Sequence, residues 1–423
     1  MKALKLIFGI VVTSLFITSV NGLAQQTFHS GGVAQCSGCH SMHTPKAGGS
    51  FLLIGGDPSS TCLNCHMRAG DTGPTSYHIS TADADMPPGV PSKQRTPGGD
   101  FGWLRKSYTF TVGGTTTTEA GQTHGHNIVA NDFGYVADTD FTTAPGGTFP
   151  SAQLGCQSCH DPHSANRRLS DGTYVKNVYT LGSVTAPIIS SGSYDNSLIP
   201  AAGQAVGVYR LLRGLGDTSQ GVTFTGVAIA VAPATYNQTE SINQVRVAYG
   251  LNAANTWGNW CATCHTSMHS NSNYVHPVDQ SLGSAVANNY NAYVKSGDLT
   301  GTQPTSFTSL VPFMENTGDI VTLASHAKND NTYLTGPSTS DQVACLSCHR
   351  AHASCWEFGF RWNDDSTFLV YNNLYPGIDT TPASPELARG RTSAETQAAY
   401  YDRPVTVFAT FQRVLCNKCH AMD

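Results

Sequence analysis

The chain has 423 residues and a formal net charge of −5, and only 12% of its residues are charged, about half the share in typical globular proteins. With Gly counted as apolar and Tyr left out, roughly 45% of the residues are apolar, the low end for globular proteins. The sequence has no basic stripe of the kind that contacts phosphates, so we expect no nucleic-acid partner.

Residues 1–24 form a predicted signal peptide. Lys2 and Lys5 make a short positive region, residues 6–20 are almost wholly apolar, and the small residues near position 24 suit a signal peptidase. We therefore expect an exported protein whose residues 25–423 form a single domain. No later stretch approaches the roughly 18 apolar residues of a membrane-spanning helix, so we expect no transmembrane span in the mature chain.

Twelve of the 13 cysteines fall into six copies of the pentapeptide CxxCH, a spacing that argues against a disulfide framework. The cysteines are, in chain order, Cys36 and Cys39, Cys62 and Cys65, Cys156 and Cys159, Cys261 and Cys264, Cys345 and Cys348, and Cys416 and Cys419. The histidines that follow them are His40, His66, His160, His265, His349 and His420. CxxCH is the attachment signal of c-type haem, and a zinc site or a redox cysteine pair would explain one copy, not six.

The spacing suits haem chemistry, because two thiols three positions apart can form thioethers along one porphyrin edge while the next residue binds the iron. We therefore expect six covalently bound haem c groups, each with its iron held by a proximal histidine. The second axial ligand then decides between electron transfer and catalysis.

Ten further histidines could supply the second ligands. The leading distal candidates are His29, His43, His126, His163, His276 and His352, and the close reserves are His78, His269 and His326. We interpret His124 as a solvated loop residue beside His126. His43, His163 and His352 each lie three residues after a proximal histidine. In a helix such a residue shares the face of the first histidine, so it must serve a different haem or none.

Six haems in a chain of this length predict a multihaem cytochrome c fold that is mostly coil, with short helices and a few short β-hairpins wrapped around a column of six haems. Burying roughly 400 Å² of apolar porphyrin surface would stabilise the fold by on the order of 10 kcal/mol per haem. Most apolar burial is then against porphyrin, so few regular elements are required.

Local patterns predict a small number of elements between the haem motifs. In chain order they are a hairpin over 107–118 with a Gly113-Gly114 turn, loops over 171–237, a helix through Val286, Tyr290 and Val294 that ends by Gly297, loops over 363–385, and a helix over 405–416 that presents the last haem. We interpret Cys355, the odd cysteine, as a small buried hydrophobe, with an intermolecular disulfide or a reactive thiol as the alternatives.

Longer stretches of the mature chain, from Phe28 to Asp423, resemble a known family. The family is that of the OmcS-type extracellular hexahaem cytochromes, and the stretches that carry the resemblance are FHSGGVAQCSGCHSMH, AGDTGPTSYHIS, TPGGDFGW, GHNIVA, CHDPH, RVAYG, WCATCHTSMH, SGDLTGTQ, CLSCHRAHAS and CNKCHAMD. The resemblance implies bis-histidine haems in alternating stacked and T-shaped pairs, and a homopolymer built head to tail. It also implies that His43 ligates the haem of His349 in the neighbouring protomer. His124 and Cys355 depart from the family pattern.

We therefore predict a non-enzymatic electron carrier without catalytic residues, which polymerises into a conductive filament on the outer cell surface. It would acquire haem in the periplasm, accept electrons from periplasmic and outer-membrane cytochromes, and pass them to metal oxides, electrodes or partner cells. Two alternatives stay open. A monomeric periplasmic shuttle shares all the haem chemistry, and a multihaem reductase needs one open haem site, although every motif here ends in His.

Overall fold

A computed structural model describes residues 36–46, 50–67, 73, 76–93, 95–176, 188–197, 199–253, 255–270, 277–381 and 385–420. The predicted signal peptide and two of the leading distal candidates, His29 and His276, lie outside the described residues.

The described helices are short, and five of them coincide with or end at a haem motif. They are α1 Pro58–His66, α2 Cys156–Cys159, α3 Trp257–Ala262, α4 Thr266–Ser270, α5 Gly283–Ala292, α6 Ile320–His326, α7 Cys345–Cys348, α8 Pro385–Ala388, α9 Ser393–Ala399 and α10 Asn417–His420. None of the helices in the described ranges is long and apolar enough for a bilayer crossing.

The strands are equally short and form small separate sheets rather than one layer. They are β1 Tyr108–Val112, β2 Thr115–Glu119, β3 Asn166–Leu169, β4 Tyr174–Lys176, β5 Ala205–Gly207, β6 Thr218–Ser219, β7 Val222–Thr223, β8 Ile229–Val231, β9 Ala248–Gly250, β10 Met314–Glu315, β11 Phe368–Tyr371 and β12 Phe411–Arg413. The sheets have the orders β1-β2, β10-β9-β8, β11-β12, β4-β3-β5 and β6-β7. The mostly coil fold is therefore confirmed.

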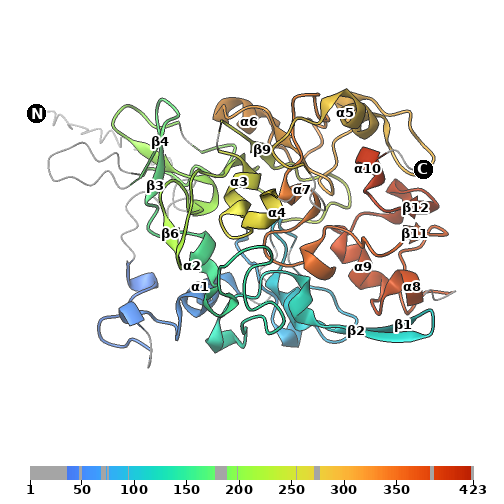
Figure 1. Ribbon diagram of the computed structural model, residues 1–423, viewed down its shortest axis with the longest axis horizontal. Helices are drawn as coiled ribbons and strands as arrows, with labels where there is room; N and C mark the ends of the chain where they lie inside the picture. The colour runs from blue at the N-terminus through green and yellow to red at the C-terminus, as the bar shows by residue number, and fades with distance from the viewer. Residues whose placement is uncertain are drawn as a thin grey trace, which may run out of the picture.

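The haem motifs follow one another across the molecule, and the β1-β2, β11-β12 and β4-β3-β5 sheets lie toward its edges (Figure 1). In Figure 1, α1 and α2 lie to the left of centre, α3, α4 and α7 near the middle, and α10 to the right.

Side-chain caps start several of these helices. Asp57 accepts from the backbone N–H of Ser60 at α1, and Thr256 accepts from that of Asn259 at α3, which satisfies N–H groups that have no partner inside the helix.

Two of the predicted elements are confirmed and one is wrong, and the predicted loops are only partly irregular, since 171–237 contains β4 to β8 and 363–385 contains β11. Strands β1 and β2 pair antiparallel about Gly113-Gly114, and α5 buries Tyr290 but ends at Ala292, leaving Val294 52% exposed. The predicted helix over 405–416 is instead a 3₁₀ turn, Val405–Val407, followed by β12. Strand β12 pairs antiparallel with β11, so a distant backbone partner overrides the local helical spacing.

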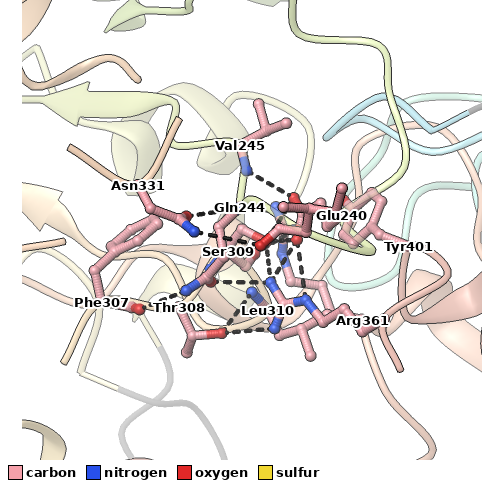
Figure 2. A network of polar contacts seen from close by, with 12 residues as sticks. Glu240, Gln244, Val245, Phe307, Thr308, Ser309, Leu310, Asn331, Arg361 and Tyr401 are labelled. Carbon is pink, nitrogen blue, oxygen red and sulfur yellow. Dashed lines mark hydrogen bonds and ion pairs between the residues drawn. The ribbon is translucent and has the colours of Figure 1, made fainter. Parts of the chain in front are cut away.

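Loops far apart in the sequence are joined by buried charged groups. The Glu240 carboxylate accepts from Arg403 Nε at 3.0 Å and from the Ser309 hydroxyl at 2.6 Å, and its second oxygen accepts from the backbone N–H of Val245 at 3.0 Å. Figure 2 shows Glu240 at the centre of this network, with Ser309 and Tyr401 around it. Such fully hydrogen-bonded ion pairs fix loop positions where sheet ladders are few.

The candidate haem channel

One large cavity brings the six motifs together. Its volume is about 2590 Å³, well beyond the roughly 300–1,000 Å³ of a pocket for one small ligand. All six proximal histidines line it, as do the motif cysteines other than Cys36. The motif cysteines that line the cavity form no disulfides, so their thiols fit thioether attachment to haem.

Consecutive motifs are paired through their first cysteines. The thiol of Cys62 neighbours that of Cys156, and that of Cys261 neighbours that of Cys345, where α1 packs against α2 and α3 against α7. The second and third motifs, and likewise the fourth and fifth, therefore lie side by side, although up to 94 residues separate the paired cysteines in sequence (156 − 62).

The proximal histidines are oriented by backbone carbonyls. In five of them the Nδ1–H donates to a carbonyl oxygen, namely His40 to Phe51 at 2.8 Å, His66 to Tyr77 at 2.7 Å, His160 to Arg210 at 2.8 Å, His265 to Pro145 at 2.9 Å and His349 to Phe358 at 2.9 Å. This bond fixes the tautomer and turns the opposite nitrogen, Nε2, away from the backbone. Metal-binding histidines are held in the same way.

Three of these carbonyls belong to residues in the left-handed backbone region. Phe51, Arg210 and Phe358 have φ of 63°, 52° and 55°, a conformation that costs a side-chain-bearing residue about 1–3 kcal/mol. They serve the first, third and fifth motifs, and in each case the proximal histidine also forms an antiparallel bridge two residues beyond the carbonyl. We call each of these three turns a cradle. Sequence reasoning missed them, because neither Phe nor Arg signals a positive φ.

Three candidate distal histidines face a proximal histidine across the cavity. The ring centres are 6.4 Å apart for His40 and His163, 6.4 Å for His160 and His352, and 5.9 Å for His126 and His265. Two imidazoles on opposite faces of one metal ion, each with a metal–nitrogen bond of about 2 Å, would have ring centres roughly 6 Å apart. The spacing therefore fits a shared iron in all three cases.

Desolvation inside the channel keeps three of the facing imidazoles, those of His126, His160 and His352, neutral. It lowers the pKa of His126 to about 4 and that of His352 to about 3, and the neighbouring histidines lower both values further. Burial likewise lowers the pKa of His160. A neutral imidazole has the lone pair that a metal requires.

The three reserve histidines are held by other groups. His78 Nε2 lies 3.3 Å from the Thr81 hydroxyl, and His326 Nδ1 lies 2.6 Å from a Glu315 oxygen; neither side chain lines the cavity. His269 lines it, but its Nε2 is 3.0 Å from an Asp279 oxygen. These contacts favour His126, His163 and His352 over the reserves.

His124 and Cys355 are both buried, but only the burial of Cys355 was expected from the sequence. His124 is completely buried rather than solvated. Its Nε2 lies 2.9 Å from a Glu119 oxygen and its Nδ1 donates to the backbone oxygen of Trp103. Our solvated interpretation was wrong because Glu119 and the distant Arg391 supply a buried polar site. Cys355, by contrast, is fully buried in the largest apolar cluster, as expected for a small hydrophobe.

His43 lies outside the cavity on the exposed surface. Its neighbour Met42 is 79% exposed, and Phe51 and Leu52 of the first cradle are 80% and 46% exposed. Phe358 of the fifth cradle is 56% exposed. Apolar groups therefore reach the surface beside the first and the fifth motifs.

No family model matches the chain. It is 48% identical over 449 aligned positions to the C-type cytochrome OmcS of Geobacter sulfurreducens, with 100% of both chains covered. Solved structures of OmcS nanowires and of an Outer Membrane Cytochrome S filament, both from Geobacter sulfurreducens, each match with a TM-score of 0.84 at 48% identity, covering 94% of this chain and 100% of theirs. The chain therefore belongs to the OmcS family of c-type cytochromes.

Proposed function

We propose that the chain is an exported, non-enzymatic cytochrome that carries electrons through six bis-histidine haem c groups and assembles head to tail into an extracellular filament. The observation that carries this proposal is the lining of one cavity by all six CxxCH motifs, with three imidazole pairs at the spacing of a shared iron. Bound haem would supply an iron that cycles between ferric and ferrous states, and a histidine on each face favours electron transfer over catalysis.

The odd-numbered motifs follow one rule for their distal ligands. His163, from the third motif, faces His40 of the first, and His352, from the fifth motif, faces His160 of the third. By the same rule His349 of the fifth motif takes its ligand from the next motif of the type CxxCHxxH. In a head-to-tail polymer that motif is the first of the neighbouring copy, and its third-position histidine is His43.

The even-numbered motifs follow a different rule. His126 precedes the third motif in sequence and faces His265 of the fourth. His29 precedes the first motif in the same way, and His276 precedes the fifth. We assign His29 to the iron of His66, and His276 to the iron of His420. With His43, His126, His163 and His352 this completes six ligand pairs.

The chain is then three copies of a two-haem unit within one domain, residues 25–423, and polymerisation continues the series. In each unit the even haem is completed by the unit itself, whereas the odd haem needs the following unit. The exposed apolar residues beside the first and fifth motifs support this junction, because large exposed apolar patches mark protein–protein interfaces. Electrons would enter from periplasmic or outer-membrane cytochromes and leave to extracellular acceptors.

The test is to isolate the exported protein and determine its mass, its spin state and its assembly. We expect the mass of six haems, an all-low-spin ferric spectrum in the filament, and filaments by electron microscopy. Discrete monomers under native conditions would contradict the assembly, and a stable high-spin iron that binds cyanide in intact filaments would instead favour a reductase.

A further inference from the structure

The third motif differs from the first and fifth at one position of its cradle. The carbonyl that accepts from the proximal histidine belongs to Arg210, whereas Phe51 and Phe358 occupy the equivalent places. All three residues share the left-handed backbone. The cradles are thus alike in main chain, and only the middle one carries a positive charge.

The guanidinium of Arg210 is enclosed by aromatic rings. Its central carbon lies 4.0 Å from the ring centre of Tyr236, 4.6 Å from that of Tyr194 and 5.2 Å from that of Tyr209. Arg210 and the three tyrosines all line the cavity. Cation–π contacts hold a guanidinium in place without neutralising it, so the rings fix a full positive charge at the wall of the channel.

This charge forms no ion pair with a carboxylate in the described part of the chain, and the side-chain contacts of its guanidinium are with the three tyrosine rings. Asp161, beside His160, is occupied: its oxygens accept from the backbone N–H groups of His163 at 2.9 Å and Ala165 at 2.5 Å. Arg210 is partly buried, and a charge withdrawn from water is costly unless it is paired. The cavity wall therefore presents a cation that calls for an anion from the channel itself.

Arg210 also lies close enough to act on the proximal ligand. The backbone carbonyl of Arg210 accepts from His160 Nδ1 at 2.8 Å, so the charged side chain starts from the residue that holds the proximal ligand. Arg213 belongs to the same segment, and its Nε donates to the backbone oxygen of Gln157, inside the third motif, at 2.6 Å. Both cations thus sit at the third haem position.

We infer that Arg210, held by Tyr194, Tyr209 and Tyr236, is the positioning residue that pairs with a propionate of the third haem and raises its reduction potential above those of the first and fifth haems. The inference rests on the proposed ligation of that haem by His160 and His352. A nearby positive charge favours the ferrous state, which carries one positive charge fewer, and the local charge is one of the levers on haem potential. Among the first, third and fifth haems of a protomer, an electron would then reside preferentially on the third.

The test is a spectroelectrochemical titration of the six-haem holoprotein carrying Arg210→Gln. In Arg210→Gln we expect the absorbance change of one haem to occur at lower potential. In Arg210→Lys, which keeps the charge, that haem should titrate close to its wild-type potential. The backbone strain at position 210 is the same in all three proteins, so the comparison isolates the charge. Arg95→Gln removes a cation that does not line the cavity and serves as the control, which should titrate like the wild type.

Mass and spin state separate this inference from the proposed function. If all six haems are present and low-spin but Arg210→Gln titrates like the wild type, the inference is overturned while the ligand pairs stand. Loss of one haem in Arg210→Gln but not in Arg210→Lys supports a charge pair with propionate. Loss of that haem in both variants overturns it, because the position would then be needed for shape alone.

Discussion

The odd-numbered and even-numbered haem motifs are built differently. In the odd motifs the proximal histidine rests on a left-handed cradle, and a second histidine follows three residues later. In the second and fourth motifs the carbonyls belong to Tyr77 and Pro145, which have ordinary backbone angles, and in the fourth the facing histidine, His126, comes from an upstream segment. Under the proposed function, the odd motifs would join one unit to the next, and the even motifs would close each unit on itself.

The most direct test of this difference is to remove the ligand that the fifth motif is expected to take from the neighbouring protomer. His43→Ala should leave six haems by mass but give one high-spin iron and few or no filaments, because the haem of His349 loses its only expected distal ligand. Electron microscopy and electron paramagnetic resonance check the two effects. Normal filaments with an all-low-spin spectrum would show that His43 is a surface residue and not a haem ligand.

Removing the distal ligand of an even-numbered motif should leave filament assembly intact. His126→Ala removes the imidazole that faces His265, so we expect one high-spin haem in protein that still forms filaments. His124→Ala, two residues away, is the matched control. It should keep an all-low-spin spectrum but lower the free energy of unfolding by about 1–3 kcal/mol, because Glu119 and Arg391 lose a buried partner. Filament loss in His126→Ala would contradict the division into odd and even roles.

The failure of sequence reasoning at His124 has a physical cause. Its partner Arg391 is 267 residues away, and no local pattern near His124 reports that contact. The cradles escaped detection for a related reason, since Phe51 and Phe358 adopt a backbone that only their histidine contacts reveal. By contrast, the spacing of the haem-attachment residues is contained within five residues, and the β1–β2 hairpin is determined by its Gly-Gly turn. Both features depend on local sequence alone, so both could be predicted.

The His124 site also predicts an acid-sensitive contact away from the haems. Burial acts to raise the pKa of Glu119, but hydrogen bonds from His124 and Arg391 outweigh it and lower the pKa to about 2. A carboxylate with a lowered pKa stabilises the fold above its unfolded pKa, and this contribution is lost as the pH falls toward the folded value. The contribution should be on the order of 3 kcal/mol at neutral pH.

Glu119→Gln measures this contribution without interference from the haem propionates, which titrate in both proteins. The free energy of unfolding of the wild type should exceed that of the variant most above about pH 5, and the difference should shrink toward zero near pH 2. A difference that stays constant over this range would show that Glu119 acts through packing rather than through its charge.

The smallest expected effect concerns the cradles themselves. Phe358 has φ of 55°, and glycine adopts this backbone without steric cost, so Phe358→Gly should relieve strain and raise the free energy of unfolding of the monomer by up to about 1 kcal/mol. Tyr77 gives the equivalent carbonyl to His66 in an even motif with ordinary backbone angles, so Tyr77→Gly should lower the same quantity by about 0.5–1 kcal/mol. Opposite signs in denaturation of the two six-haem proteins would show that strain is confined to the odd motifs. Equal losses would mean that the phenyl group of Phe358, although 56% exposed, contributes more by its contacts than its backbone costs.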